Sequence, residues 1–334
     1  MIPLPDQISK CLIVKPSSLG DIIHSLPFLD AFHKQFPLTE IHWLVASQFT
    51  GLLEGHPMIT RLWSINKSGW KKPSMLSSTL RELGKLAKDL RKERFDIAVD
   101  LQGLLRSGLI SRLSNAPIRV GFSSARELST FFYTHKVNAS TSSHAVDRYL
   151  EVAAELGCDV INPEFPMTHD EYPLPFDDYA VLAPGARWDT KLWPSESFGT
   201  LASLLPMKSV IIGSAEDIER AGVVEQRASG KAHNLAGMTT LREAVAVIRN
   251  ARFVITNDSG PMHIAAALSV PTYAIFGPTS PGLTGPYGQG HTIIRTGDDC
   301  SPCFKRSCEH TKCMEGVSPS QVLEAIMANS GLSF

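Results

Sequence analysis

Three polar segments of the chain hold residue types suited to acid–base and phosphate chemistry. The first, KPSSLGDIIHSLP, passes Ser17 and Ser18, turns at Gly20 and reaches Asp21, where we expect a helix to begin. A carboxylate there can take a proton from a sugar hydroxyl. It can also simply cap the helix, a stabilisation of about 1 kcal/mol. Residue 21 on its own favours the cap.

The second segment, APGARWDTKLWPSESF, follows an apolar run and contains Arg187 and Lys191 ahead of a helix expected to begin at Pro194 and Ser195. Free N–H groups at a helix N-terminus attract anions, and a lysine beside them is well positioned to bind a diphosphate. The alternative interpretation is ordinary surface charge in a loop.

The third segment, ITNDSGPMHIAAAL, is a turn between an apolar run and a helix, with the residues Asp258, Ser259, Gly260, Pro261 and His263. Its backbone N–H groups and helix dipole suit an anion. Gly260 permits close approach of the backbone. Asp258 would repel a phosphate, so we expect it to orient the loop or hold a sugar hydroxyl.

Glu243 has two interpretations. A glutamate near a helix start accepts both hydroxyls of a ribose in some dinucleotide-binding folds. The sequence T-x-x-E from Thr240 is also the pattern of a capping box, with which residues 240–243 agree very well.

Apolar, β-branched runs alternate with helical patterns along the chain, which predicts parallel sheets of the doubly wound α/β class. The runs cover residues 11–15, 41–46, 95–101, 179–185, 209–214, 251–258 and 271–277. A segment rich in proline and acidic residues, 163–178, indicates a linker. We therefore expect two Rossmann-like domains, residues 1–165 and 178–318, facing a cleft. A terminal helix, residues 319–334, is expected to pack back on the N-terminal domain.

Composition narrows the function. A length of 334 residues suits two domains, and a net charge of −1 gives no reason to expect nucleic-acid binding. Residues 61–136, however, carry fifteen Lys or Arg against six Asp or Glu, which suggests a local anionic partner. For residues 81–94 we favour solvated helix faces. Neither GxGxxG nor a Walker A motif occurs, which weakens an oxidoreductase assignment. Without a signal peptide or apolar span, we expect a cytoplasmic protein.

Four cysteines stand close together near the end of the chain, with the spacing C-x2-C-x4-C-x4-C: Cys300, Cys303, Cys308 and Cys313. Such a cluster in a cytoplasmic protein suggests a small structural zinc site, or an iron–sulfur site as the less favoured metal. Free or redox-labile thiols are an equal alternative. In each case we expect a structural role.

Six segments, in order, resemble the ADP-heptose:lipopolysaccharide heptosyltransferases of glycosyltransferase family 9. They are KPSSLGDIIHSLP, VDLQGLLRSGLIS, RVGFSSARELSTFFYTHKV, HAVDRYLEVAAELG, PGARWDTKLWP and TNDSGPMHIAAALSVPTYAIFGPTSP. The SSARE and HAVDRYL strings lean towards the type I enzymes, which add the first heptose to the Kdo of lipid A. Type II and type III enzymes share most of the motifs, so the acceptor stays open.

The resemblance implies a GT-B fold and inverting transfer that needs no metal. Asp21 would be the general base, and Lys191 with the turn at residues 259–263 would neutralise the leaving diphosphate. Asp258 would contact the heptose and Glu243 the ribose. The donor-binding set would be Arg187, Glu243, Asp258, Ser259, Gly260, Pro261 and His263. The acceptor-binding set would be Ser17, Ser18, Gly20, Lys71, Lys72, Arg126 and Arg148.

The implied partners are ADP-heptose, a Kdo-bearing or heptosylated inner-core acceptor, and the anionic face of the inner membrane, with which the protein would associate peripherally. Two other hypotheses remain. A nucleotide-sugar epimerase or hydrolase on the same scaffold would need no basic acceptor face. The other is a non-enzymatic protein, either a nucleotide-sugar sensor or a metal-stabilised assembly protein. Motifs on both sides of the expected cleft argue against it, since a sensor has no use for a general base facing the donor phosphates.

Overall fold

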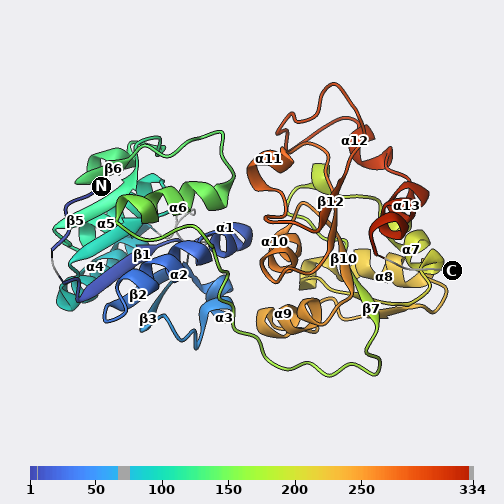
Figure 1. Cartoon of the computed structure of the whole chain (residues 1–334), viewed down its shortest axis with the longest axis horizontal. Coiled ribbons are helices and arrows are strands. Elements are labelled where there is room, and N and C mark those ends of the chain that lie inside the picture. Colours follow the sequence, from blue (N-terminus) through green and yellow to red (C-terminus); the bar gives the residue numbers. More distant parts are fainter. Residues whose placement is uncertain (6, 67–75, 331–334) are drawn as a thin grey trace. The chain divides into compact units, whose positions relative to one another are not determined.

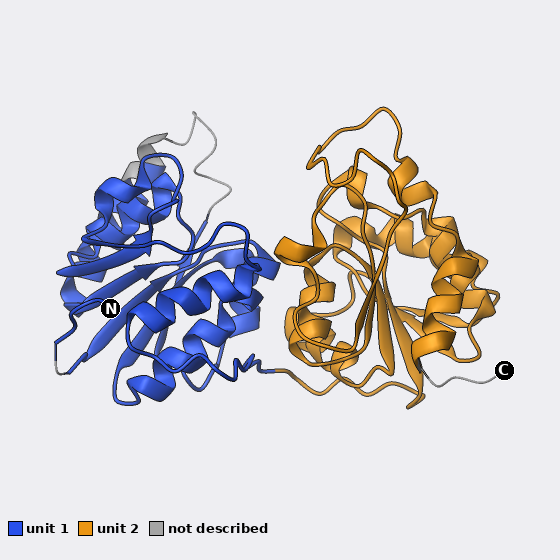
Figure 2. Ribbon diagram, turned by 45° about the horizontal axis from the view of Figure 1, so that its top comes forward, with its two compact units in different colours: residues 1–168 blue, residues 169–334 orange. Residues whose placement is uncertain are grey.

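The computed structural model describes residues 1–5, 7–66 and 76–330. The chain divides into two compact units, Met1–Thr168 and His169–Phe334, which Figure 2 colours separately. The division falls inside the segment 163–178 that we interpreted as a linker.

The first unit is built on a six-stranded parallel sheet with the order β3-β2-β1-β4-β5-β6 (Figure 1). Its strands are β1 (Lys10–Val14), β2 (Glu40–Ala46), β3 (Arg61–Ile65), β4 (Ile97–Asp100), β5 (Ile118–Phe122) and β6 (His135–Val137). The central strands are almost wholly buried. A parallel strand covered by helices on both faces buries both sets of side chains, so a continuous apolar run marks it.

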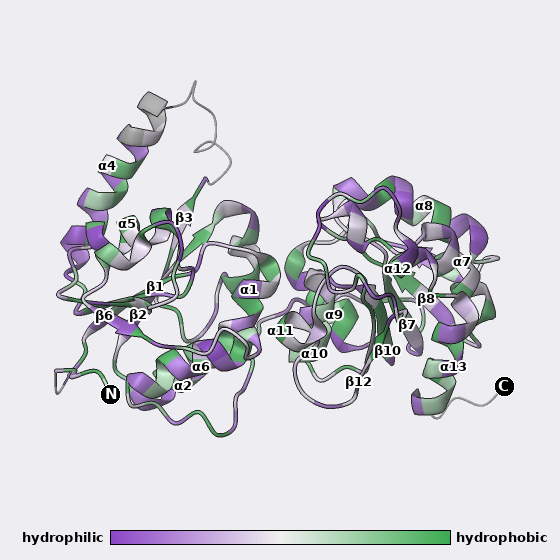
Figure 3. Cartoon of the chain, turned by 90° about the horizontal axis from the view of Figure 1, so that it is seen from above, coloured by the Kyte–Doolittle hydropathy of each residue, from purple (hydrophilic) through white to green (hydrophobic). Residues whose placement is uncertain are grey.

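The first unit's helices lie on both faces of this sheet: α4 and α5 pack together on one face, and α2 and α6 pack together on the other (Figure 3). The helices are α1 (Leu19–His24), α2 (Leu26–Gln35), α3 (Thr50–Leu53), α4 (Leu76–Glu93), α5 (Leu105–Leu113) and α6 (Ala145–Glu155), with 3-10 turns η1 (Ser47–Phe49) and η4 (Ser129–Phe132). Hydrophilic and hydrophobic residues alternate along α4, as expected of a helix with one solvated face.

The second unit repeats the arrangement with the order β12-β11-β10-β7-β8-β9. Counted from its own first strand, this is the strand order of the first sheet. The strands are β7 (Tyr179–Ala183), β8 (Lys208–Ile211), β9 (Ala232–Asn234), β10 (Phe253–Asn257), β11 (Thr272–Ile275) and β12 (His291–Ile294), all paired in parallel. Two doubly wound Rossmann-like sheets were expected, and this is confirmed.

Helices α7, α8 and α13 cover one face of the second sheet, and α9 and α10 cover the other (Figure 1). The helices are α7 (Ser195–Leu204), α8 (Ile218–Arg227), α9 (Leu241–Arg249), α10 (Gly260–Ala267), α11 (Pro281–Thr284), α12 (Lys312–Glu315) and α13 (Pro319–Ser330), with 3-10 turns η5 (Asp189–Lys191) and η6 (Ala215–Asp217).

The terminal helix α13 corrects one expectation. We expected it to pack on the N-terminal domain, and this is wrong. Val322 and Ile326 are fully buried in the core of the second unit, together with Trp193 of that unit. Just before the helix, the Trp193 indole donates to the Val317 carbonyl over 2.8 Å. The apolar positions of α13 therefore complete the core of the second unit.

Across the described residues, no helix combines the length and apolar character needed to cross a bilayer.

Candidate functional site

In each sheet the strand order reverses between two central strands, β1 and β4 in the first and β7 and β10 in the second. Open α/β sheets bind ligands outside the carboxyl ends of the strands at this point. The loops leaving these four strands carry, in turn, Asp21, Gln102, Lys191 and Asp258. The loops selected from their residue types therefore lie where such a sheet binds its ligand.

Asp21 lies in the first turn of α1 and does cap the helix. The backbone N–H of Ser18 and the Ser18 hydroxyl both donate to Asp21 Oδ2, over 2.8 and 2.7 Å. Its other oxygen, Oδ1, lies 4.0 Å from Lys15 Nζ, and the side chain is 39% exposed. The capping bonds hold the carboxylate in one orientation while leaving part of it accessible. The two interpretations of Asp21 are thus compatible.

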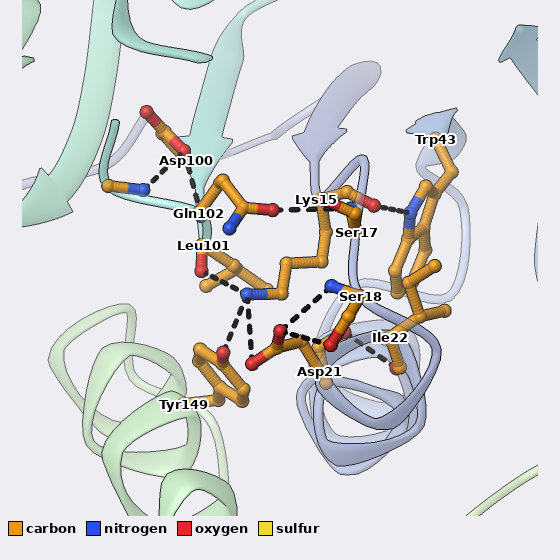
Figure 4. Close-up of polar contacts among 12 residues, drawn as sticks. Lys15, Ser17, Ser18, Asp21, Ile22, Trp43, Asp100, Leu101, Gln102 and Tyr149 are labelled. Carbon is orange, nitrogen blue, oxygen red and sulfur yellow. Dashed lines mark hydrogen bonds and ion pairs between the residues drawn. The ribbon is translucent and has the colours of Figure 1, made fainter. Parts of the chain in front are cut away.

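Lys15 is the first residue of this loop, directly after β1, and it is only 2% exposed. Its ammonium donates to the Tyr149 hydroxyl over 2.6 Å and to the Leu101 carbonyl over 2.9 Å (Figure 4). Tyr149 comes from α6 and Leu101 directly follows β4, so the lysine connects these two segments beside Asp21. Sequence reasoning did not single out Lys15 or Tyr149.

The loop after β4 is fixed by the buried Asp100. Its Oδ1 accepts from the backbone N–H groups of Gln102 and Gly103, and its Oδ2 accepts from the Tyr133 hydroxyl over 2.6 Å. Burial raises the pKa of Asp100, against the opposing effect of these hydrogen bonds. Gln102 then accepts a hydrogen bond from the backbone N–H of Ser17, which ties the two loops of the first unit together.

The predicted acceptor residues gather around these loops in part. Arg126 donates its backbone N–H to the Gly103 carbonyl, over 2.9 Å. Arg148 precedes Tyr149 on α6 and lies over the Phe122 ring at 5.5 Å. Its buried Nε meets no acceptor among the residues that the structure describes. Lys71 and Lys72 lie outside the described residues. Of the other predicted acceptor residues, Ser17 and Gly20 are buried and Ser18 is half-buried.

A groove lined by cations lies elsewhere on the first unit. Its lining residues are Gly84, Ala87, Lys88, Arg91, Lys92, Arg94 and Leu113. The groove lies beside the C-terminal parts of α4 and α5. One of its residues, Arg94, shortly precedes β4, which begins at Ile97. Parallel strands begin at the sheet edge opposite to the one where they end. The groove is therefore not part of the candidate site.

In the second unit, Lys191 and Asp258 form a close ion pair. Lys191 Nζ lies 2.6 Å from Asp258 Oδ2, with the side chains 15% and 4% exposed. Thr279 donates its hydroxyl to the same oxygen over 2.6 Å. Asp258 thus fixes the position of the Lys191 ammonium. The Lys191 ammonium also lies 4.6 Å from the centre of the Trp188 ring, and the Arg306 guanidinium lies 4.9 Å from the centre of the same ring.

The two loops of the second unit are joined through Asn257 at the end of β10. Asn257 Oδ1 accepts from the Trp193 backbone N–H, and its Nδ2 donates to the Pro184 carbonyl. Helix α10 begins just beyond, with Ser259 as its N-cap and Pro261 in its first turn. His263 is buried in that helix. The predicted anion-binding turn and the predicted lysine are therefore held side by side, whereas Arg187 is exposed in its loop.

Glu243 forms the capping box that its sequence indicated. Its Oε2 accepts from the backbone N–H of Thr240 over 2.7 Å, and its own N–H donates to the Thr240 hydroxyl over 3.2 Å. One carboxylate oxygen is therefore committed to the start of α9.

The four cysteines line one small cavity, together with Thr190, Pro278, Lys305, His310 and Thr311. Burial raises the pKa of the Cys313 thiol, and the neighbouring Cys300 and Asp298 add to the effect. Over the described ranges, no three His, Cys, Asp or Glu side chains are arranged to hold a metal ion. The segment is nevertheless attached to the lysine loop, because Thr190 donates its hydroxyl to the Lys305 carbonyl over 2.8 Å.

Known proteins resemble this chain over most of its length. Residues 83–314 match the model of glycosyltransferase family 9 (heptosyltransferase). Over 323 residues the chain is 32% identical to lipopolysaccharide heptosyltransferase 1 of Pseudomonas aeruginosa, covering 90% of this chain and 88% of that protein. It is 30% identical over 305 residues to the Escherichia coli K12 protein of the same name, with coverages of 86% and 93%. The solved E. coli heptosyltransferase WaaC with ADP matches with a TM-score of 0.77 at 27% identity, over 96% of this chain and 99% of that one.

Proposed function

The chain belongs to glycosyltransferase family 9, the heptosyltransferases, and from that premise we propose that it transfers heptose from ADP-heptose to the Kdo or heptose inner core of lipopolysaccharide. Its fold is GT-B. The acceptor assignment is supported by relatives named lipopolysaccharide heptosyltransferase 1, and the donor by a similar structure that contains ADP.

One observation carries the mechanism: Asp21 is a partly exposed carboxylate held at the switch point of the first sheet by two bonds from Ser18. In the proposed step, Asp21 accepts the proton of the acceptor hydroxyl. That oxygen bonds to C1 of the heptose while the bond from C1 to the diphosphate oxygen breaks. ADP leaves with the electron pair, and the configuration at C1 inverts.

Negative charge develops on the diphosphate as it leaves, and interactions aimed at that charge lower the barrier. We assign this task to Lys191 and to the N-terminus of α10 at Ser259 and Gly260, with His263 in the first turns of that helix. Arg187 and Pro261 complete the donor-binding set. Because Asp258 already fixes the ammonium, Lys191 needs little rearrangement on binding. A ribose contact by Glu243 would use Oε1, since Oε2 caps α9.

We propose that Arg126 and Arg148, with Lys71 and Lys72, bind the acidic groups of the acceptor. We further propose a cytoplasmic enzyme that binds the anionic inner membrane peripherally. An apolar patch made of Leu105, Leu128 and Phe131 supports this, with side chains 44%, 69% and 79% exposed. The Glu127 carboxylate accepts from the Leu105 backbone N–H, which brings Leu105 close to the segment that carries Leu128 and Phe131. Arg106 and Arg126 are neighbours of these residues in sequence. Apolar side chains beside cations suit an anionic bilayer surface.

The decisive experiment replaces Asp21 with asparagine. A general base contributes about 10²–10⁴-fold, so we expect Asp21→Asn to lose transfer by that factor while calorimetry shows unchanged ADP-heptose binding. The chain offers a matched control in Asp217, which accepts from the backbone N–H and hydroxyl of Ser214 in the same geometry, over 2.9 and 2.8 Å. Asp217→Asn should keep transfer close to the wild-type rate.

Several outcomes would contradict parts of the proposal. Normal turnover by Asp21→Asn would show that the base lies elsewhere. Tight binding of UDP but not ADP would refute the donor. Consumption of ADP-heptose without an acceptor would indicate a hydrolase. Comparing Kdo-bearing with heptosylated acceptors identifies the acceptor, and loss of transfer with a chelator would refute metal independence.

A further inference from the structure

We propose that Lys15 is a positioning residue for transfer: its buried ammonium, held by Tyr149 and Leu101, keeps Asp21 in the ionised form that accepts the acceptor proton. This rests on the proposed role of Asp21. Lys15 would touch neither substrate, because it lies beneath the loop with 2% of its surface exposed.

The ammonium is held in place from several sides. Two of its three protons are used by the Tyr149 hydroxyl, over 2.6 Å, and the Leu101 carbonyl, over 2.9 Å. The Asp21 Oδ1 oxygen lies 4.0 Å from the same nitrogen, so the charge reaches the carboxylate without displacing its bonds to Ser18 (Figure 4). The backbone of Lys15 is fixed as well, because its carbonyl accepts from the Trp43 indole and its N–H donates to the Leu44 carbonyl.

Burying an ammonium at this position costs free energy. Removing a charge from water costs several kcal/mol, and apolar side chains of similar volume often stabilise a core equally well. The four residues before Lys15, Cys11 to Val14 of β1, are apolar and buried, so a methionine would continue their pattern. The charge is therefore better explained by what it does to Asp21 than by stability.

The charged and titratable groups around the ammonium determine its state. From α1 it faces Asp21, from β4 Asp100, and from α6 Tyr149, with Arg148 adjacent to that tyrosine. Burial alone lowers the pKa of Lys15, but Tyr149, Asp21 and Asp100 outweigh it and the pKa is raised. Burial raises the pKa of Tyr149, against the opposing effect of Lys15. The lysine is therefore charged and the tyrosine neutral throughout the pH range in which the enzyme is assayed.

The test uses the full chain with the substitution Lys15→Met. A carboxylate that loses a neighbouring cation is protonated more easily, so the acidic limb of kcat/KM against pH should move to higher pH. We expect a shift of about one pH unit, the lower end of the range for an opposite charge within 4–6 Å, because solvent screens the partly exposed Asp21. At a fixed mildly acidic pH this is about a tenfold loss of kcat/KM, with unchanged calorimetric affinity for ADP-heptose.

Lys15→Arg keeps the charge and is the matched control: its acidic limb should stay at the wild-type pH, whatever its maximal rate. If Lys15→Met does not fold, Lys15→Gln carries the same test, since its amide can still donate to the Leu101 carbonyl. A neutral variant whose profile is lower but unshifted would overturn the proposal and leave Lys15 a purely structural role. Failure of the proposed function is distinguishable, because Asp21→Asn would then retain transfer.

Discussion

The ion pair between Lys191 and Asp258 allows a quantitative prediction about stability. In Asp258→Ala, the Lys191 ammonium loses its carboxylate partner at 2.6 Å, and the buried Thr279 hydroxyl loses its acceptor. Removing one member of a buried pair leaves an uncompensated charge and costs about 3–5 kcal/mol. Both side chains are less than a sixth exposed, at 15% and 4%, so solvent recovers little of that cost.

The cost converts to a change in melting temperature. For a domain of about 150–250 residues, each kcal/mol lowers the melting temperature by about 2–4 °C. The second unit falls in this size class, so we expect its calorimetric transition to drop by about 6–20 °C in Asp258→Ala. The double variant with Lys191→Met should recover part of the loss, because no charge is then left unpaired.

A matched surface pair serves as the control. Asp178 lies 3.3 Å from Arg252 in the same unit, but the side chains are 61% and 40% exposed. Exposed pairs contribute about 0–1 kcal/mol, so Asp178→Ala should melt within about 4 °C of the wild type. If Asp258→Ala melted no lower than Asp178→Ala, the pair would not be the buried, mutually dependent contact described above.

Three further predictions concern other regions of the chain. Burial lowers the pKa of His56 below its usual value of 6.5. In the folded state the neutral ring donates to the Pro166 carbonyl and accepts from the Met58 N–H. As the pH falls, the unfolded chain therefore binds a proton at this histidine before the folded chain does. Stability should therefore fall from about pH 7.5 to about pH 5.5, and an equal fall in His56→Gln would disprove this origin. Replacing the three residues of the apolar patch with serine should reduce sedimentation with phosphatidylglycerol vesicles, while Leu204→Ser with Ile218→Ser, exposed apolar residues of the second unit, should not; equal binding by both variants would exclude the patch. For the four cysteines, the predicted structural zinc is tested by elemental analysis of the purified chain, and a preparation without metal but with four reactive thiols would favour the free-thiol alternative.

The central strands were predictable because burial on both faces leaves a strong signal in sequence. Every apolar run that we identified coincides with a strand between the sheet edges, such as β1 and β10. The edge strands were missed because one side meets solvent, and β5, which lies between β4 and β6, was missed as well. In β3, for example, buried, half-buried and exposed residues mix over five positions, and β9 has three positions of which none is buried. Such short, mixed runs resemble loops.

The loops of the candidate site were predictable where the polar residues stand in one loop, and not where distant segments contribute them together. Asp21, Lys191 and Asp258 stand in polar loops after apolar runs, which residue types alone reveal. The partnership of Lys15 with Tyr149 joins residues 134 positions apart, so no local pattern indicates it. One local signal was available. Lys15 stands directly after an apolar strand and before Pro16, and a lysine next to a buried strand is unusual because lysine is rarely buried. Asp100 gave a similar signal at the end of β4.

The repeated strand order has a consequence for how such enzymes diversify. Along the described chain, each sheet is completed by strands of its own unit, and the covalent join runs through the segment 163–178. Recombination at that join between relatives would exchange one complete half without dividing a sheet. Under the proposed roles, a new sugar acceptor could then be acquired by replacing the first half alone, while nucleotide recognition is inherited unchanged.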